Sequence, residues 1–346
     1  MKKIIAALLA AALLLACSAL SLAEEENLLN IFTWEDYIDA DTLAGFTGET
    51  GIKVNFATFA SNEEMLLKLE ANGDSEYDIV VASDYIISAA RKEGLLRPLD
   101  RAKLTGWDNL NPAYLDQYFD PENAYSVPYT VGSPMIVYNP ELVEGEIARF
   151  DDLWDPQFED ALWLLDDARV TFGEVLHTLG YSYNTTDAAE LAEGAEKLNA
   201  LKPNVRVLDY DMSYNYLTSG EAKAGYIFTP FVVLTLMEDP SLVAVYPQDG
   251  IGFGIDSLVI PANAPHPENA HLFLDYCLRP EVAAHVAEYQ LYINPNRAAD
   301  ALIDPAIAEM SPFHIPEDLL ATAEYVEDLG EDESLFQDIW TAFHLS

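Results

Sequence analysis

The sequence has few positive charges. Of its 346 residues, 17 are Lys or Arg and 59 are Asp or Glu, so the formal net charge is −42. A protein that binds nucleic acid needs clustered basic side chains to meet the phosphates, and this composition argues against such a partner. Disorder is also excluded, because 50% of the residues are hydrophobic and 11% are aromatic.

Cysteine is scarce, and the common catalytic motifs are absent. The two cysteines are Cys17 and Cys277. Cys277 lies in an apolar pattern of helical spacing and is predicted to be a small core residue. The chain has no G-x-x-x-x-G-K-[ST], H-E-x-x-H or G-x-S-x-G motif, and its six histidines form no ligand-like pair. We therefore expect a protein that is not an enzyme and has neither a cofactor nor a metal.

One long apolar run is present, at the N-terminus. Lys2 and Lys3 precede an unbroken run from Ile4 to Ala16, which is shorter than the ~20 residues of a membrane-spanning helix and suits a signal peptide. Its end, Leu14-Leu15-Ala16-Cys17, resembles a bacterial lipobox. It predicts a signal peptide at 1–16, acylation of Cys17 and a lipidated tether at 17–27. The alternative is ordinary cleavage after Ala23. Either way the mature chain is extracytoplasmic, and a lipid is its one predicted membrane contact.

Short apolar runs alternate with helical patterns along the rest of the chain. Asp41 and Asp187 are predicted helix caps, and Gly51 is a predicted helix stop. The glycines between Gly250 and Gly254 are predicted to form a tight turn between strands. The predicted strands are 28–32, 52–56, 77–82, 162–165, 205–208, 226–228 and 258–260, and the predicted helices are 41–50, 62–71, 86–92, 171–180, 187–201 and 334–343. The alternation predicts parallel, helix-covered sheets. Because the length suits roughly two domains and no flexible linker is seen, we expect two lobes joined by crossing strands.

Acidic and aromatic residues follow several of these strands. Trp34-Glu35-Asp36-Tyr37 follows the first strand, Ser83-Asp84-Tyr85 the third, and Asp166-Asp167 the strand at 162–165. Ligands of open α/β sheets bind beyond the carboxyl ends of strands. Carboxylates and aromatic faces there suit a cationic, partly apolar ligand. In so acidic a chain, some of these neighbours also arise without function, and Trp34 could be a packing residue.

The sequence resembles the bacterial spermidine/putrescine-binding proteins, the extracytoplasmic solute-binding lipoproteins of polyamine ABC transporters. The resemblance runs from about Leu28 to Phe343. The segments that carry it are Trp34–Ile38, Phe46–Val54, Tyr77–Val81 with Ser83 and Tyr85, Arg91–Gly94, Tyr125–Tyr129, Leu165–Arg169, Leu179–Ser182 with Asn184–Asp187, and Asp256–Ala264.

The resemblance implies an α/β, two-lobed periplasmic-binding-protein fold of type II. Each lobe is then a discontinuous, helix-covered sheet, and the ligand lies in the interlobe cleft. The implied lobes are 28–132 with 256–300, and 133–255 with 301–346, and the implied crossings lie near Gly132 and Gly254-Ile255. The implied partners are a polyamine and ABC permease subunits, and we expect a monomer.

The family's ligand cleft carries over residue by residue. Asp256 is the strongest candidate, with a capping role as its structural alternative. The resemblance implies polyamine contacts at Trp34, Asp36, Tyr37, Ser83, Tyr85, Asp167, Asp256 and Tyr292. Glu35 stands where the family usually has a hydroxyl residue, and would add a carboxylate. Four positions depart from the family pattern: Val170 replaces a glutamate, Val326 a glutamine, and Phe228 and Gly254 two tryptophans.

The sequence leaves the ligand open in three ways. Putrescine, spermidine or both could bind, because the cleft has lost a carboxylate, an amide and an aromatic wall. The same fold could bind another organic cation. An extracytoplasmic enzyme acting on an amine, with Asp167 or Asp256 as its general base, is the alternative of a different class.

Overall fold

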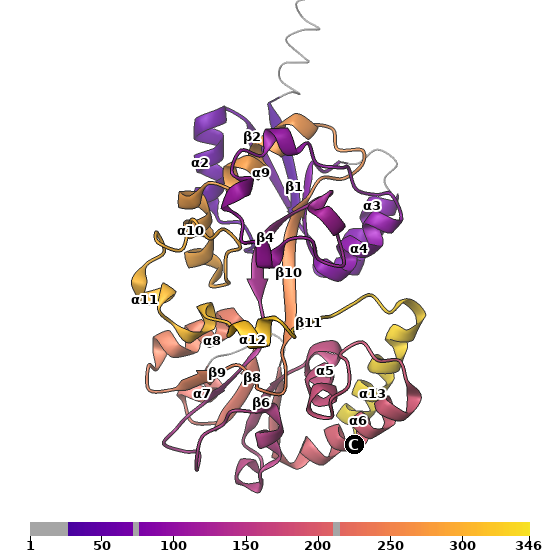
Figure 1. Ribbon diagram of the computed structural model, residues 1–346, viewed down its shortest axis with the longest axis vertical. Helices are drawn as coiled ribbons and strands as arrows, with labels where there is room; N and C mark the ends of the chain where they lie inside the picture. Colours follow the sequence, from indigo (N-terminus) through magenta and orange to yellow (C-terminus); the bar gives the residue numbers. More distant parts are fainter. Residues whose placement is uncertain (1–26, 72–75, 210–214) are drawn as a thin grey trace, which may run out of the picture.

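The computed structural model describes residues 27–71, 76–209 and 215–346. The predicted signal peptide, the acylated Cys17 and all but the last residue of the tether lie outside these ranges. The described chain forms two lobes, each built on its own sheet (Figure 1). We define lobe 1 by the six-stranded sheet and lobe 2 by the five-stranded sheet. No helix in these ranges has the length and apolar character needed to span a bilayer.

Lobe 1 contains the N-terminal part of the chain and a later return. Its elements are β1 (Leu28–Thr33), α2 (Ala40–Thr50), β2 (Lys53–Thr58), α3 (Asn62–Ala71), β3 (Ile79–Ser83), α4 (Asp84–Lys92), β4 (Ser126–Gly132), β10 (Gly252–Val259), α9 (Pro267–Cys277), α10 (Pro280–Gln290) and β11 (Glu324–Tyr325). The sheet order is β11-β10-β3-β1-β2, and β4 pairs with β10 on its other side.

Lobe 2 contains the middle of the chain and its C-terminal helix. Its elements are β5 (Met135–Tyr138), β6 (Leu162–Leu165), α5 (Ala168–Thr178), α6 (Ala188–Leu201), β7 (Val205–Asp209), α7 (Asn215–Thr218), β8 (Ala224–Ile227), α8 (Thr229–Glu238), β9 (Val243–Val245) and α13 (Glu333–Leu345). The sheet order is β7-β6-β8-β5-β9. Two short helices, α11 (Pro305–Ala308) and α12 (Glu317–Leu320), lie on the segment that precedes β11.

The sheets are mixed, where the sequence predicted parallel ones. In lobe 1, β2 and β3 are parallel to β1, but β10 is antiparallel to both β3 and β4. In lobe 2, β7 and β8 are parallel to β6, and β5 is antiparallel to β8 and β9. The antiparallel strands adjoin the points where the chain passes between lobes, and such a passage needs no parallel crossover helix.

Alternating side chains divide the core of each lobe between the two faces of its sheet. On β1, Leu29 and Ile31 pack with Phe46 and Phe273, whereas Phe32 packs on the opposite face with residues of α3 and α4. This period of two is what a strand buried on both faces requires. In lobe 2 the same division occurs along β6, whose four residues are all fully buried. Cys277 is a buried core residue of lobe 1, as predicted.

Strands join the lobes. The chain leaves the first sheet at Gly132, the last residue of β4, and enters the second sheet at Met135. It returns between Val245 and Gly252, and β11 later pairs with the start of β10. The lobes therefore meet where β4, β10 and β11 converge (Figure 1).

Two local predictions were wrong. Asp39, rather than Asp41, caps α2: its Oδ1 accepts the backbone N–H groups of Asp41 and Thr42 at 2.8 and 2.9 Å. Gly252 to Gly254 lie inside β10 rather than in a turn, because this stretch pairs with β11 and, at Gly254, with β4. The predicted stop at Gly51 is confirmed, since this residue ends α2 with a φ of 74°.

Candidate ligand-binding site

The segment after β1 begins the predicted site. Trp34 is half-buried, and its ring lies edge-on to Phe59 with a centroid distance of 4.5 Å. Glu35 and Asp36 are exposed. Asp36 has a φ of 56°, a left-handed conformation that aspartate tolerates better than most residues. The turn exposes two carboxylates to solvent and leads into Tyr37.

Tyr37 contacts the strand that carries Asp256. The Tyr37 hydroxyl donates to Oδ2 of Asp256 and lies 2.9 Å from Oγ1 of Thr130 on β4. Ser83, at the end of β3, stands opposite Asp256 in the antiparallel register and also hydrogen-bonds to its side chain. The structure thus brings together three predicted ligand residues, Tyr37, Ser83 and Asp256, at the junction of the lobes.

Burial controls the ionisation of this group. It raises the pKa of Asp256, while the hydrogen bonds from Tyr37 and Ser83 act in the opposite direction. Burial also raises the pKa of Tyr37 well above its usual value, and the neighbouring Asp256 carboxylate adds to this rise. A bound cation would oppose the cost of keeping Asp256 charged. The group is therefore chemically suited to hold an ammonium.

Tyr292 lies beside Gly132, the last residue of β4. A Cβ added to Gly132 would lie 2.6 Å from Cε1 of Tyr292, so a side chain at 132 would displace the ring. Tyr292 also adds to the raised pKa of Tyr37. The glycine at the first crossing therefore makes room for a predicted ligand residue.

Tyr85 is positioned by a residue that the sequence did not reveal. Asn62, the first residue of α3, donates from Nδ2 to the Tyr85 hydroxyl at 3.0 Å and to Oγ of Ser83 at 3.1 Å. The Tyr85 hydroxyl donates in turn to Glu63 at 3.0 Å. Asn62 is 5% exposed, so it is a buried polar residue that orients two predicted ligand residues. Its position at a helix start gave no signal of this role.

The remaining predicted residues lie on lobe 2. Asp167 caps α5, and its Oδ1 accepts the backbone N–H groups of Arg169 and Val170, both at 2.9 Å. Burial raises the pKa of Asp167, and these two hydrogen bonds oppose the rise. Phe228 precedes α8 and packs against the lobe 2 core. Asp166 is engaged by Trp340 and His344, at 2.8 and 2.9 Å. On lobe 1 the structure groups Tyr37, Ser83, Tyr85, Asp256 and Tyr292, whereas Asp167 and Phe228 lie on the second lobe.

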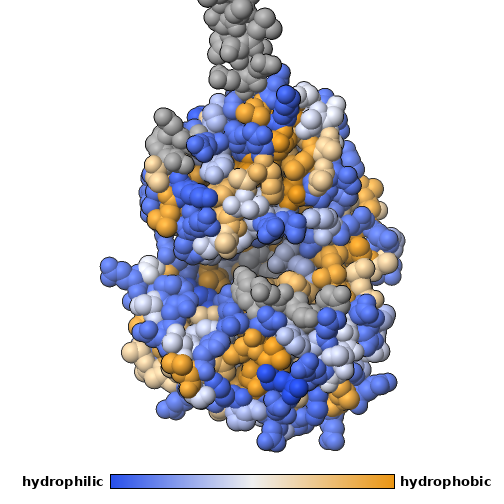
Figure 2. Space-filling model, turned by 180° about the vertical axis from the view of Figure 1, so that it is seen from behind, coloured by the Kyte–Doolittle hydropathy of each residue, from blue (hydrophilic) through white to orange (hydrophobic). Residues whose placement is uncertain are grey.

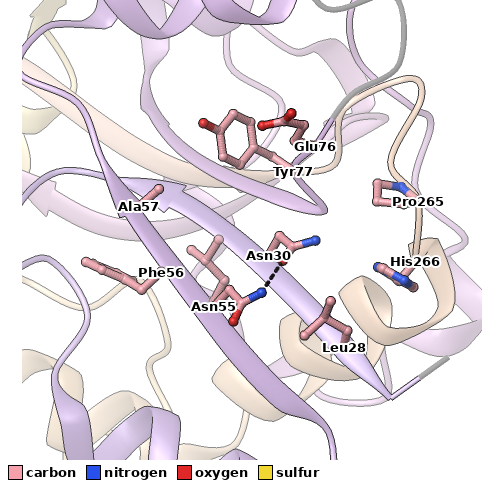
Figure 3. A pocket seen from close by; sticks show the side chains of 10 residues that line it. Leu28, Asn30, Asn55, Phe56, Ala57, Glu76, Tyr77, Pro265 and His266 are labelled. Carbon is pink, nitrogen blue, oxygen red and sulfur yellow. Dashed lines mark hydrogen bonds between the residues drawn. The ribbon is translucent and has the colours of Figure 1, made fainter. Parts of the chain in front are cut away.

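The surface is hollowed between the two lobes (Figure 2). A pocket of about 390 Å³ lies at the same level, lined by Gln117 and Tyr118 of lobe 1, Ser182 and Asn184 of lobe 2, and Ala323 to Tyr325 with Glu327. A larger cavity, of about 770 Å³, lies elsewhere on lobe 1, beside β1 and β2 (Figure 3). Neither lining includes a ligand residue that the family resemblance predicts. Among the described residues, no group of His, Cys, Asp or Glu is arranged to hold a metal ion.

A protein family described as bacterial extracellular solute-binding protein matches residues 41–312. The chain belongs to this family. It is 37% identical over 334 residues to the spermidine/putrescine-binding periplasmic protein of Escherichia coli (strain K12), an alignment that covers 94% of this chain and 96% of the relative. The putrescine-binding periplasmic protein PotF of the same strain is 34% identical, over 92% of this chain and 91% of the relative.

Solved structures agree with this assignment. The substrate-binding protein PotD of a spermidine/putrescine ABC transporter from Streptococcus pneumoniae has a TM-score of 0.85 at 34% identity, covering 92% of this chain and 99% of that one. A protein from Listeria monocytogenes described as a putative spermidine/putrescine ABC transporter has a TM-score of 0.81 at 37% identity, covering 92% and 99%. The two-lobed type II fold is confirmed. The chain is a solute-binding transporter component that acts outside the cytoplasm, and not an enzyme.

Proposed function

We propose that this protein captures a polyamine, putrescine or spermidine or both, and delivers it to an ABC importer by closure of the two lobes. The observation that supports this most is the group formed by Tyr37, Ser83 and Asp256 at the junction of the lobes. A buried carboxylate can fix an ammonium, and the neighbouring rings can clasp methylenes. The names of the relatives point to the same ligand class.

Two carboxyls on opposite lobes give a physical reason for closure. Asp256 belongs to lobe 1 and Asp167 to lobe 2, and burial raises the pKa of both. Bringing two such groups together without a cation is unfavourable, because like charges repel in a medium of reduced dielectric. A diammonium ligand removes this penalty. The ligand therefore binds the closed arrangement more tightly than the open one, and this difference in affinity favours closure.

The best test is titration calorimetry with putrescine, spermidine, cadaverine and an unrelated cation such as choline. We expect saturable binding of at least one polyamine and loss of at least tenfold in affinity for Asp256→Asn. Asp41→Asn removes an exposed carboxylate of lobe 1 and is the charge-matched control. Binding of choline alone would replace the polyamine proposal with that of another organic cation.

The domain limits, the anchor and the oligomeric state are part of the proposal. We assign lobe 1 to 28–132 and 256–300 and lobe 2 to 133–255 and 301–346, although the lobe 1 sheet also includes the start of β10 and β11. We further propose that the protein is a monomer held at the membrane by a lipid on Cys17. Cys17→Ala should then release it from the membrane fraction, and a native N-terminus at Glu24 without lipid would contradict the anchor.

A further inference from the structure

Asp84 lies between two residues of the proposed site but was not among the predicted ligand residues. It occupies the first turn of α4, between Ser83 and Tyr85, and is 3% exposed. Its Oδ1 accepts the backbone N–H of Tyr85 at 2.7 Å, and its Oδ2 accepts that of Ile255 at 3.2 Å. Because Ile255 directly precedes Asp256, Asp84 is hydrogen-bonded to the strand that carries the strongest ligand candidate.

Several titratable groups face this carboxyl. Burial raises the pKa of Asp84 well above its usual value, and the charges of Asp256 on β10 and of Glu327 after β11 add to the rise, against the hydrogen bonds from Ile255 and Tyr85. Burial raises the pKa of the Tyr118 and Tyr325 phenols, and the charge of Asp84 adds to this rise.

The cationic side chain that acts on Tyr118 is already engaged. Arg169 of α5 pairs with Glu333 and donates to the carbonyl of Glu327. Within the described ranges, no salt bridge includes Asp84, Asp256 or the Glu327 carboxylate. The described residues therefore supply no ion-pair partner to these acids.

Gly254 has room for a side chain close to the Asp84 carboxyl. Among the described residues, a Cβ added to Gly254 would meet a single atom within 4 Å, Oδ2 of Asp84, at 4.0 Å. The pocket of about 390 Å³ is lined by Tyr118, Tyr325 and Glu327, each of which interacts electrostatically with Asp84, although Asp84 itself is not part of the lining. The glycine at position 254 therefore leaves room beside a buried carboxyl.

We propose that Asp84 is a further carboxyl of the polyamine cleft, which faces a ligand ammonium seated beside Gly254 and loses its proton when that ammonium binds. The inference rests on the proposed function. In the proton step the O–H bond of the Asp84 carboxyl breaks and the proton passes to solvent. The ammonium keeps all its protons, and no covalent bond to the ligand forms.

The proton step gives the binding a defined pH dependence. In the free protein Asp84 stays protonated at higher pH than an ordinary aspartate, and a nearby ammonium favours its charged form. Binding therefore releases protons, and affinity rises with pH until the free carboxyl is itself ionised. Asp256 has a raised pKa as well and adds a rise of the same sign. Removing Asp84 should lower the pH slope without abolishing it.

Calorimetry of the full chain with putrescine tests this, at pH 5.5 to 8.5 in buffers of different ionisation enthalpy, which report the protons released. We expect Asp84→Asn to bind ten- to a hundredfold more weakly at pH 8, with a gap that closes toward pH 5.5, and to release fewer protons. The control is Asp41→Asn, because Asp41 is also a first-turn aspartate of a lobe 1 helix but is exposed. It should match the wild type throughout.

A second variant keeps the test decisive if Asp84→Asn folds poorly, which thermal unfolding without ligand would reveal. Gly254→Leu fills the space and leaves Asp84 in place, and it should also weaken binding and reduce proton release. If the wild type binds putrescine and both variants keep its pH profile and proton release, the Asp84 assignment is wrong and the proposed function stands. If the wild type binds no polyamine, the proposed function fails and this inference fails with it.

Discussion

At the scale of single residues, the proposed site depends on polar side chains that are held by other polar side chains. Asn62 binds both Ser83 and Tyr85, and Tyr37 binds Asp256. Buried polar groups arranged in this way are costly to leave unpaired, so each restricts the position of the next. The fold therefore preorganises the proposed ligand residues of lobe 1.

Val170 is the departure from the family pattern that we expect to affect ligand choice most. It is half-buried at the start of α5, packs against the lobe 2 core, and follows the proposed ligand residue Asp167 by three positions. Spermidine has one ammonium more than putrescine, and a valine cannot pair with it. Val170→Glu should raise spermidine affinity by about one to two decades and putrescine affinity less, as measured by calorimetry.

The matched control for this change is Val170→Gln, which has a similar size and no charge. If Val170→Gln improves spermidine binding as much as Val170→Glu does, the charge argument is wrong. The wild type could also bind spermidine a hundredfold more tightly than putrescine, with neither variant changing this preference. That result would contradict the proposal that the cleft lacks a carboxylate at position 170.

Glu174 provides a residue-scale test of stability against pH. It is fully buried in lobe 2, where its Oε2 accepts hydrogen bonds from Tyr183 and Tyr226 at 2.5 and 3.1 Å. Burial raises the pKa of Glu174 from 4.5 to about 8, although these hydrogen bonds oppose the rise. The folded state thus keeps a proton that the unfolded state loses between these two values.

Unfolding stability should therefore fall as pH rises from 4.5 to about 8, by up to about 1.4 kcal/mol per pH unit from this group. Glu174→Gln should flatten this slope in urea titrations at pH 5 to 8. Glu196→Gln changes an exposed glutamate of α6 and should leave the slope as it is. Equal slopes in all three proteins would show that Glu174 ionises normally.

At the scale of elements, the sequence predicted the regular strands and helices better than the crossings. Strand 162–165 and helix 62–71 were predicted with the observed bounds, because their apolar spacing is strong and local. The two residues of β11 and the glycine-rich start of β10 carry no such pattern. Both form through pairing with distant segments, which a local signal cannot contain.

The same limit applies to the site. Tyr37 and Ser83 were found as residues that follow apolar runs, whereas Asp256 was proposed from the family resemblance. The structure brings the three together. Asn62 was missed as a site residue, and Asp84 was noted only as an acid that follows the third predicted strand. Asn62 on α3 contacts Ser83 on β3, and Asp84 on α4 contacts Ile255 on β10. Both contacts join residues that are far apart in the sequence, so local residue spacing does not indicate them.

The cap of α2 is a test at this scale. Asp39 accepts two backbone N–H groups and the Thr42 hydroxyl, and it also contacts His285. Asp39→Ala should lower the free energy of unfolding by about 1 kcal/mol in urea titrations. Asp41→Ala, in the same turn, should cost less because Asp41 does not cap the helix. A larger loss for Asp41→Ala would overturn the assignment of the cap.

At the scale of the whole molecule, two features attract a cation. The net charge of −42 surrounds the protein with a negative potential, and the junction of the lobes concentrates acids that have no salt-bridge partner among the described residues. The overall charge attracts a cation over a distance that depends on the salt concentration, whereas the acids at the junction act on a cation that is in contact with them. Salt should therefore separate them, because it screens exposed charges more than buried ones.

The association rate of putrescine should fall several-fold between about 10 and 150 mM salt, because the screening length shrinks from about 30 to about 8 Å. The dissociation rate should change less, since it depends on contacts inside the closed cleft. Stopped-flow measurement of intrinsic fluorescence gives both rates. Spermidine, with three charges against two, should show the steeper dependence. If association is independent of salt for both ligands, the overall charge does not steer them and capture depends on the cleft alone.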